Sequence, residues 1–204
     1  MKNIISFLII LIFGAFVFFI GWTQIKVKPG TVGVVESKTG GINSQLIIPG
    51  NFSWHKEFLI PTNANINKFE YKPYNGTKTI TGSRGQGADF SFSFQISLSY
   101  EPQIIISLLK DNKISNQQDF EEYLDSVAAY LAQRSADYYM NMFSKNSDFT
   151  PESVTLSELT SAIAYYKEYP EFDINVLALT SYKLPYNSIS AVSSIYSSAE
   201  GNEL

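Results

Sequence analysis

An uninterrupted apolar run near the N-terminus, IISFLIILIFGAFVFFIGW at residues 4–22, constrains this chain more than any other stretch. The run contains neither a charged residue nor a proline. As an α-helix it would extend about 28 Å, close to the thickness of the hydrocarbon core of a bilayer. A helix satisfies its own backbone polar groups, so it is the structure expected in lipid. We therefore predict a transmembrane helix within residues 1–24 and place Trp22 at the level of the headgroups.

Two other interpretations of this run, a cleaved signal and a buried helix, predict sequence features that can be checked. A removable secretory signal normally has a shorter apolar core and a cleavage site with small residues. The residues that follow the run, from Trp22 to Ile25, contain no such site. A buried helix of a soluble core would normally carry a polar stripe. We therefore expect an uncleaved, single-pass membrane anchor.

The lysines that flank the run give conflicting signals about the side of the membrane. Lys2 precedes the run, whereas Lys26, Lys28 and Lys38 follow it together with one acid, Glu36. Because lysines near a span tend to stay in the cytoplasm, this count favours a cytoplasmic body. An N-terminal span with one leading lysine and a large following domain often has the opposite orientation. We lean towards an extracytoplasmic body and leave the cytoplasmic orientation open.

The composition indicates a folded body with little capacity for cofactor chemistry. Aromatic residues make up 15% of the chain, which favours a packed core over a disordered stalk. The net charge is −4 and only two arginines occur, so the chain lacks the basic patch that nucleic acid binding requires. Cysteine is absent, which excludes disulfides and thiolate metal sites. We expect no cofactor and no nucleic acid partner.

The residues after the anchor are expected to form mostly strands up to about residue 100. Strand character occurs at residues 31–37, 54–60, 64–71, 77–81 and 88–100. The last of these segments alternates apolar and polar residues, which is typical of a half-buried strand. The glycine-rich residues 82–87 should join it to the preceding strand as a hairpin. The alternating apolar residues are Phe90, Phe92, Phe94, Ile96, Leu98 and Tyr100.

Helical patterns begin after Pro102. The expected helices lie at residues 104–110, at 117–143, from about 155 onward and within 186–198, with a strand at 172–181. Ser115 and Gln118 predict a capping box for the long helix, and Thr155 and Glu158 predict one for the next, whose apolar stripe includes Tyr166. The stripe of the long helix consists of Phe120, Leu124, Val127, Leu131, Tyr138 and Met142.

This order of elements predicts an α+β fold. It comprises an N-terminal transmembrane helix, an antiparallel-rich β subdomain, and then helices with a returning strand. The expected parts are an anchor at 1–24, a β-rich subdomain at 25–110, a helical and strand subdomain at 111–185, and a short helical stub at 186–204.

Several short motifs follow one another in order along the chain. They are VKPGTVGVV at 27–35, Pro49-Gly50 ahead of Phe52, FLIP at 58–61, a strand that ends at Tyr100-Glu101-Pro102, and Leu184-Pro185. This succession resembles the SPFH, or band 7, family of stomatin, prohibitin, flotillin and the bacterial modulators of the membrane AAA protease. The resemblance extends over about residues 1–196 and implies an SPFH-like fold.

The resemblance also implies a membrane-anchored scaffold that is not an enzyme. Members of the family assemble on a membrane and organise its proteins, so we expect contact with a lipid bilayer, a homo- or hetero-oligomer with other SPFH proteins, and a membrane-bound AAA protease as a candidate partner. Residues 186–204 are serine-rich, and we expect a divergent member without the long C-terminal coiled coil of the family. The alternative is an anchored protein-binding module that acts as a monomer or small oligomer. A third interpretation is an enzyme that uses serine, lysine or carboxylate groups.

Few residues have the pattern of a chemical site. His55 is the only histidine and cannot form a triad or a histidine-rich metal site alone. Residues 82–87 have the glycine spacing of a phosphate loop, but no Lys-Ser/Thr pair follows them. Four carboxylates, Asp119, Glu121, Glu122 and Asp125, lie at the start of the long helix, where they complement its dipole. Acid–base chemistry or cation binding is their other interpretation. We expect no catalytic, cofactor or metal site.

A cluster of apolar residues close to the anchor is the candidate membrane-contact site. Its members are Phe52, Trp54, Phe58, Leu59 and Ile60. Aromatic and aliphatic side chains next to a span can enter the bilayer surface and seat the folded body there. The alternative is that they fill the core of the β subdomain.

Overall fold

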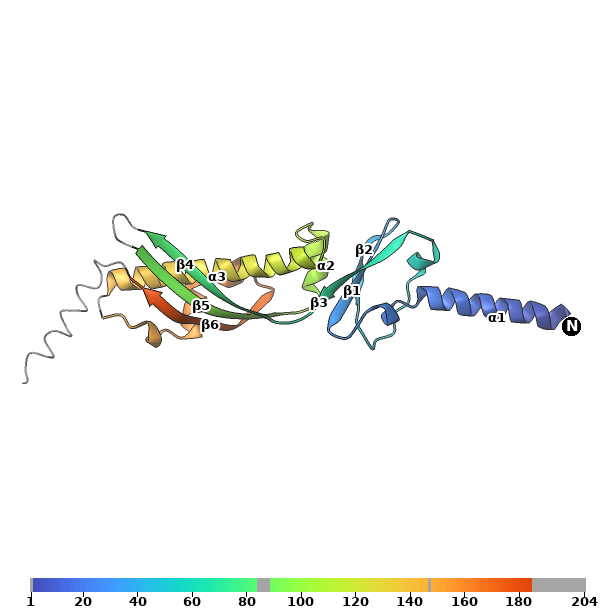
Figure 1. Ribbon diagram of the computed structural model, residues 1–204, viewed down its shortest axis with the longest axis horizontal. Helices are drawn as coiled ribbons and strands as arrows, with labels where there is room; N and C mark the ends of the chain where they lie inside the picture. The colour runs from blue at the N-terminus through green and yellow to red at the C-terminus, as the bar shows by residue number, and fades with distance from the viewer. Residues whose placement is uncertain (1, 84–88, 147, 185–204) are drawn as a thin grey trace, which may run out of the picture. The chain divides into compact units, whose positions relative to one another are not determined.

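The computed structural model describes residues 2–83, 89–146 and 148–184 (Figure 1). The chain divides into two units. The first unit contains the residues up to 72 together with 101–123, and the second contains 73–100 and the residues from 124 onward. The general class is confirmed as α+β, with an apolar N-terminal helix and antiparallel sheets.

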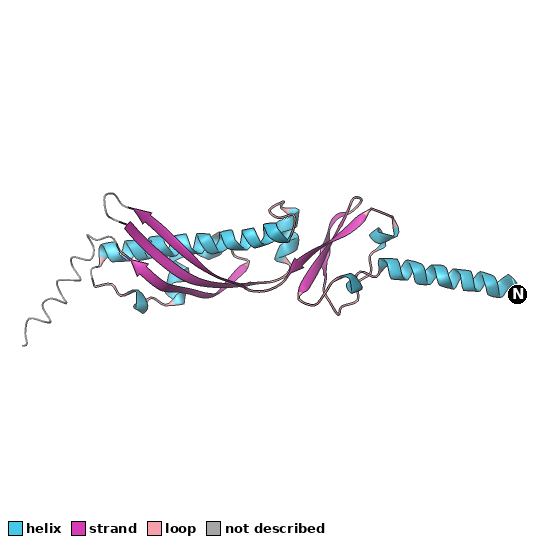
Figure 2. Ribbon diagram, viewed as in Figure 1, coloured by secondary structure: helices cyan, strands magenta, loops and turns pink. Residues whose placement is uncertain are grey.

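The first unit combines the apolar helix with a small antiparallel sheet, in the strand order β2-β1-β3 (Figure 2). Its elements are α1 (Lys2–Gly21), η1 (Gln24–Lys26), β1 (Thr31–Ser37), β2 (Gly41–Ile47), η2 (Lys56–Leu59), β3 (Ala64–Glu70) and α2 (Ile104–Lys110). Of the described helices, α1 is the one long and apolar enough to cross a membrane. Its large side chains are exposed, as expected for a helix whose surroundings are lipid.

The central strand β1 carries the core of the first unit. Val34 and Val35 point to opposite faces of the sheet and are both buried, because each face is covered. Val35 packs with Val27 and Ile47. At Gly33 a Cβ atom would lie 2.8 Å from the side chains of both Ile66 and Val27. The close packing of this core therefore requires a glycine at that position.

The second unit packs helices on a three-stranded antiparallel sheet, in the order β4-β5-β6. Its elements are β4 (Tyr74–Ser83), β5 (Asp89–Tyr100), most of α3 (Gln117–Lys145), η3 (Pro151–Ser153), α4 (Leu156–Ile163), η4 (Tyr165–Lys167) and β6 (Phe172–Lys183). The strands β4 and β6 form the two edges of this sheet.

The alternation predicted for residues 88–100 is confirmed by β5. Phe92 and Phe94 are fully buried, and the ring of Tyr139 from α3 lies 6.3 Å and 6.0 Å from theirs. The intervening polar residues face the other side of the sheet, where Ser93 bonds Thr79 of β4 at 2.9 Å. Because β5 is the central strand, its apolar face forms the middle of the core of the second unit.

The strand predicted at residues 54–60 is wrong. Only Trp54 forms an isolated bridge, with Trp22, and the 3₁₀ turn η2 follows it. The N–H group of His55 donates to the carbonyl of Gly21 at 2.9 Å, so the segment bonds to the end of α1 instead of to a sheet. Pro61, which cannot donate a backbone hydrogen bond, follows directly.

The N-terminal cap predicted for α4 is confirmed, whereas the one predicted for α3 is wrong. At α4 the predicted cap is confirmed, since Thr155 Oγ1 accepts from the N–H of Glu158 at 3.2 Å. At α3 the predicted Ser115–Gln118 box is wrong. Asn116 Oδ1 accepts from the N–H of Asp119 at 3.0 Å, and the Asp119 carboxylate accepts from the Ser115 N–H at 2.8 Å. An asparagine can cap a helix as well as a serine can.

Three of the residues named in the predicted apolar stripes, Tyr138, Met142 and Tyr166, are not fully buried. On α3 the buried ring is that of Tyr139, whereas Tyr138 is half-buried and its hydroxyl donates to Glu158 at 3.0 Å. The helix α4 ends at Ile163, because Ala164 has a φ of 50°, in the left-handed region that ends a helix. Tyr166 lies beyond this point and is exposed.

The two units divide the chain differently from the expected parts. Residues 73–100, which belong to the predicted β-rich subdomain at 25–110, group with residues 124 onward, because β5 pairs with β6 from Ser91↔Lys183 to Tyr100↔Phe172. The hairpin pairing of β4 with β5 is confirmed, from Tyr74↔Leu98 to Ser83↔Asp89. The connecting residues 84–88 and the helical stub predicted at 186–204 lie outside the described residues.

The burial of the β5 face can be tested with a charge. We expect Phe92→Asp to lower the free energy of unfolding by more than about 3 kcal/mol, because it buries an unpaired carboxylate. Ser93→Asp is the matched control, since it places the same charge one residue away on the other face. Near-ultraviolet circular dichroism during thermal unfolding in detergent measures both variants. A folded Phe92→Asp protein would contradict the assignment of the faces.

Candidate membrane-contact site

The end of α1 is joined to the segment that contains the candidate site. The N–H of His55 donates to Gly21 O at 2.9 Å, and the N–H of Thr23 donates to Ser53 O at 3.0 Å. The indole N–H of Trp54 donates to the carbonyl of Phe18 at 3.1 Å. The last carbonyls of a helix have no partner within the helix, and here residue 55 supplies the partner of the Gly21 carbonyl. The Phe18 carbonyl accepts from the N–H of Trp22 at 3.1 Å as well as from Trp54. We call this junction, formed by residues 18–23 and 52–55, the clasp.

Aromatic rings pack around the clasp. The rings of Phe18 and Phe52 are stacked with their centroids 5.9 Å apart, and Trp22 lies 5.7 Å and 6.5 Å from them. A Cβ atom on Gly21 would lie 2.2 Å from the indole nitrogen of Trp54. The absence of a side chain at residue 21 therefore allows the indole of Trp54 to approach the helix backbone.

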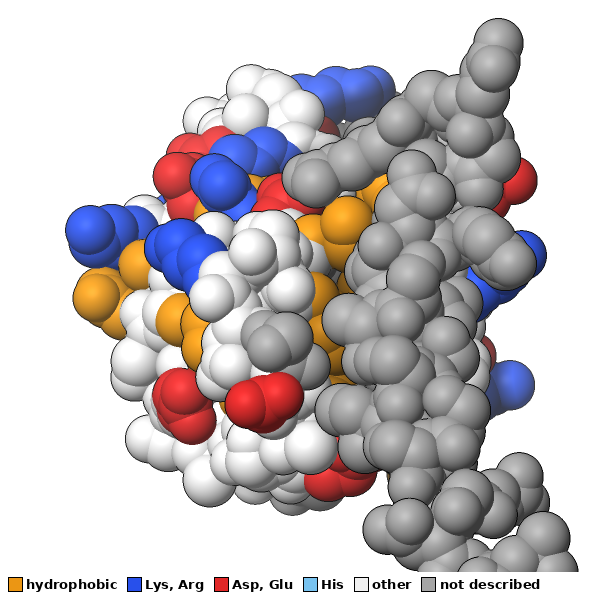
Figure 3. Space-filling model, turned by 90° about the vertical axis from the view of Figure 1, so that its left-hand side faces the viewer, with side chains coloured by type: hydrophobic (Ala, Val, Ile, Leu, Met, Phe, Trp, Pro, Cys, Tyr) orange, Lys and Arg blue, Asp and Glu red, His pale blue; other side chains and the backbone are white. Residues whose placement is uncertain are grey.

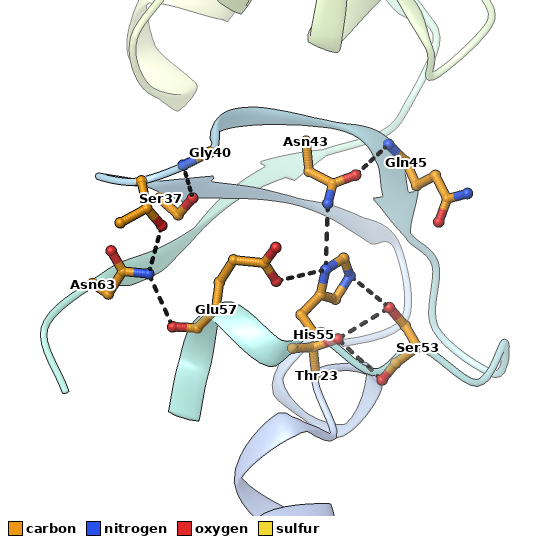
Figure 4. A network of polar contacts seen from close by, with 10 residues as sticks. Thr23, Ser37, Gly40, Asn43, Gln45, Ser53, His55, Glu57 and Asn63 are labelled. Carbon is orange, nitrogen blue, oxygen red and sulfur yellow. Dashed lines mark hydrogen bonds and ion pairs between the residues drawn. The ribbon is translucent and has the colours of Figure 1, made fainter. Parts of the chain in front are cut away.

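A buried polar network lies beside these rings (Figure 4). Thr23 is fully buried, and its hydroxyl lies 3.0 Å from Ser53 Oγ. The Nε2 atom of His55 lies 3.0 Å from the same oxygen, and its Nδ1 atom lies 3.4 Å from Asn43 Nδ2. The oxygen of the Asn43 amide accepts from the N–H of Gln45 at 2.8 Å, so the amide nitrogen faces the imidazole.

This geometry defines the protonation state of His55. An amide nitrogen only donates, so Nδ1 accepts from Asn43 and Nε2–H donates to Ser53. Burial lowers the pKa of His55, and the Glu57 carboxylate, 3.8 Å from Nδ1, partly opposes this by raising the pKa. His55 is therefore a neutral histidine, with Nε2 bonded to Ser53 of the clasp and Nδ1 bonded to Asn43 of β2. From the sequence, His55 was not expected to form a catalytic or metal site, and nothing in the sequence indicated this network.

The structure separates the five candidate membrane-contact residues into two groups. Phe58 is half-buried and packs against the Val27, Val35 and Ile47 core, as the core-filling alternative expects. The other four are exposed, with Phe52 at 63% and Ile60 at 57%. They are Phe52, Trp54, Leu59 and Ile60. Ile25 and Ile48 are also exposed. We did not single them out from the sequence, because isolated aliphatic residues have no distinctive pattern.

The four carboxylates of α3 bond to different partners. Glu121 and Glu122 accept from Gln117 and Gln118, at 2.7 Å and 2.9 Å. Hydrogen bonds from Ser115 lower the pKa of Asp119. Asp125 lies in the second unit, where Lys78 and Tyr74 bond it and Lys78 lowers its pKa. Within the described ranges, no group of three His, Cys, Asp or Glu side chains could hold a metal ion.

A groove of about 600 Å³ in the second unit follows the edge strand β6. Eight consecutive residues of β6, 175–182, line one side of it. Tyr139, Pro151, Glu152, Val154 and Leu156 line the other. Figure 3 shows acidic, basic and apolar side chains interspersed on one face of the second unit. The groove is therefore a candidate for an extended chain segment, recognised through the backbone of β6.

Comparison with known proteins gives one relative without an assigned function. The chain is 28% identical over 182 residues to an uncharacterized protein of Treponema pallidum (strain Nichols). The match covers 81% of this chain and 61% of that protein, so the chain spans about three fifths of the length of its relative. No model of a known protein family matches the sequence.

The close approach at Gly21 can be tested by adding one methyl group. We expect Gly21→Ala to lower the free energy of unfolding by about 1–3 kcal/mol, because the indole of Trp54 must move away. In a Trp54→Ala background the same change should cost far less. Gly14→Ala is the matched control in the same helix, since no atom lies within 4 Å of a Cβ built there. Equal costs of Gly21→Ala in both backgrounds, measured by urea unfolding in detergent, would contradict the contact.

The pKa of His55 should make the stability of the first unit depend on pH. Because this pKa is lower in the folded chain, the unfolded chain takes up the proton first as the pH falls below about 6.5. Stability is therefore complete above that pH and decreases below it, until the folded state is also protonated. We expect urea unfolding, followed by tryptophan fluorescence, to show a lower free energy at about pH 5.5 than at about pH 7.5.

Two variants separate this effect from general acid sensitivity. His55→Gln keeps an acceptor for Asn43 and a donor for Ser53 but does not titrate, so it should flatten the pH dependence. Glu57→Gln removes the charge that favours the imidazolium, so it should make the dependence steeper. The same slope in the wild-type protein and His55→Gln would show that His55 is not responsible.

Proposed function

We propose that this chain is a membrane-anchored scaffold of SPFH type. In this proposal it self-associates on the membrane and organises or regulates membrane proteins, a membrane-bound AAA protease among them, with its units on the extracytoplasmic side. The observation that carries the proposal is the clasp. If α1 were a removed signal, Trp54 and the N–H of His55 would lose their partners Phe18 and Gly21. An uncleaved anchor keeps these hydrogen bonds.

The exposed apolar residues near the clasp support contact with lipid. Phe52 stacks on Phe18 of the helix and Trp54 donates to its carbonyl, so both side chains lie beside the last turn of α1. In a membrane-spanning α1 this turn lies close to the headgroups, where Trp is favoured. Ile60 and Leu59 extend the same exposed segment. We propose that these side chains seat the first unit on the bilayer.

The edges of the second sheet support self-association. The edge strands β4 and β6 have 10 and 12 residues, and a long edge strand offers a row of backbone groups for pairing with another chain. Pairing of β6 in one copy with β4 in the next would be a heterologous contact. Repeated contacts of this kind close into rings when the rotation between copies allows it.

The groove beside β6 supports a second candidate function, an anchored protein-binding module. An extended segment of a partner protein could add to the edge of β6 and place side chains against Val154 and Leu156. A monomer or small oligomer could act in this way. Both functions are non-enzymatic, and the engagement of His55 in the clasp supports a structural role for the only histidine.

The native mass of the full chain distinguishes the two functions. We expect particles of many copies in detergent or nanodiscs, measured by light scattering or native mass spectrometry. Val176→Lys on β6 should reduce their size, because it places a charge on the edge strand. Ser97→Lys is the matched control, since Ser97 is the register partner of Val176 on the central strand β5.

Each outcome favours a different function. A monomeric wild-type chain would overturn the scaffold and leave the binding module. Large particles with equal mass in both variants would keep the scaffold and overturn assembly through the β6 edge.

A further inference from the structure

The charge of this chain is distributed unevenly along the sequence. Residues 23–72 contain six lysines and three glutamates, a net charge of +3. Residues 73–204 contain eight lysines and arginines and sixteen acids, a net charge of −8. The overall charge of −4 hides a basic segment that directly follows the membrane-spanning run. Basic residues at this position are attracted to anionic lipid.

Lys26 lies at the end of the anchor helix. Its ammonium group donates to the carbonyl of Ile20 in the last turn of α1 at 3.3 Å. The same nitrogen lies 4.2 Å from the centre of the Phe58 ring. These two contacts direct the charge towards the end of the helix. When α1 spans a bilayer, this ammonium lies near the phosphates of the headgroups.

Lys26 borders a hollow in the surface of the first unit, and a second lysine, Lys68 of strand β3, borders it as well. The hollow measures about 420 Å³ and is lined by Lys26, Phe58, Asn65, Ile66 and Lys68. Lys28 follows two residues after Lys26, and Lys56 follows the clasp residue His55. All four lysines are exposed, and within the described part of the chain none has a carboxylate within ion-pair distance. We call these four residues, Lys26, Lys28, Lys56 and Lys68, the lysine rim.

Exposed apolar side chains lie next to the lysine rim. Lys56 stands in the sequence between Trp54 and the exposed pair Leu59 and Ile60. Aromatic or aliphatic side chains together with lysines are typical of surfaces that lie in the membrane interface. The apolar groups enter the acyl boundary, and the ammonium groups meet the phosphates. An acidic protein would satisfy the lysines but would leave the apolar groups beside α1 unexplained.

We propose that the lysine rim binds the headgroups of anionic lipids and holds the first unit against the bilayer. The hollow between Lys26 and Lys68 receives a headgroup phosphate, and Phe52, Trp54 and Ile60 contact the acyl boundary. This inference rests on the anchoring part of the proposed function and names the lipid class, but it does not depend on self-association. The lysines also favour a cytoplasmic position by the positive-inside rule, and the binding itself requires only that the leaflet next to the first unit contains anionic lipid.

Tryptophan fluorescence can test this proposal directly. The chain has two tryptophans, Trp22 and Trp54, and both belong to the clasp. Trp22→Phe leaves Trp54 as the only reporter in the full chain. The protein is placed in nanodiscs of phosphatidylcholine with or without phosphatidylglycerol, and brominated lipids measure how far Trp54 enters. We expect stronger quenching and a blue-shifted emission in the anionic discs, both reduced by added salt.

Variants of the lysine rim test its charge. In the Trp22→Phe background we combine Lys26→Gln with Lys68→Gln. The ratio of molecules whose first unit contacts the bilayer to molecules whose first unit does not should fall by about fivefold for each lysine removed. Lys145→Gln with Lys167→Gln is the matched control, because it removes the same charge from the second unit. The control should keep the quenching of the parent. Circular dichroism confirms that all the variants are folded.

Three results would overturn the proposal. Equal quenching in the two kinds of disc would show contact without a preference for anionic lipid. Equal losses in the rim and control variants would show an effect of net charge alone. A water-exposed Trp54 in every disc would exclude the lipid contact and assign the lysines to an acidic partner protein. The native mass of the particles is measured separately, so none of these results is confused with failure of the scaffold.

Discussion

The point on which the first unit depends is the end of α1, where a helix suited to lipid must begin a folded domain. The last carbonyls of any helix lack partners within it, and leaving them unsatisfied next to an apolar environment is costly. At Gly21 the chain meets this need with a distant segment, since the N–H of His55 donates to the Gly21 carbonyl. The indole of Trp54 adds a second hydrogen bond to the carbonyl of Phe18, which also accepts from the N–H of Trp22. The same contacts place residues 52–55 beside the helix. The helix α1 is therefore packed into the first unit rather than attached to it by a free linker.

The clasp also explains the arrangement of polar and apolar groups near the helix end. A neutral imidazole and a buried threonine meet at Ser53, so the polar atoms inside the clasp are paired. Phe52 and Ile60 remain exposed, and the ammonium of Lys26 lies at the last turn of α1. Apolar groups and cations at one helix end suit a bilayer surface, where acyl chains and phosphates lie within a few ångströms of each other. The second unit differs, since its described residues form a sheet with two long edge strands, β4 and β6, and a groove follows β6.

Most regular elements follow from local patterns in the sequence. The alternation in β5 places Phe92 and Phe94 in the core, because side chains alternate between the faces of any strand. The apolar run at residues 4–22 indicates the helix α1, and Thr155 with Glu158 indicates the start of α4. Other local signals were misleading. Asn116 caps α3 although Ser115 and Gln118 match a capping box, because both residues can offer an oxygen and only the path of the chain selects between them.

The candidate site shows where the sequence alone was insufficient. By itself the sequence determined the long apolar helix, the alternation of β5 and the presence of an apolar segment at residues 52–60, because these depend on the spacing of neighbouring residues. Only the tertiary structure decided that this segment closes on α1 and not on a sheet, that Phe58 turns inward while Phe52 turns outward, and that Lys68 joins Lys26. Each of these depends on contacts between residues far apart in the chain. The spacing of apolar and polar residues within a short stretch carries no information about such contacts.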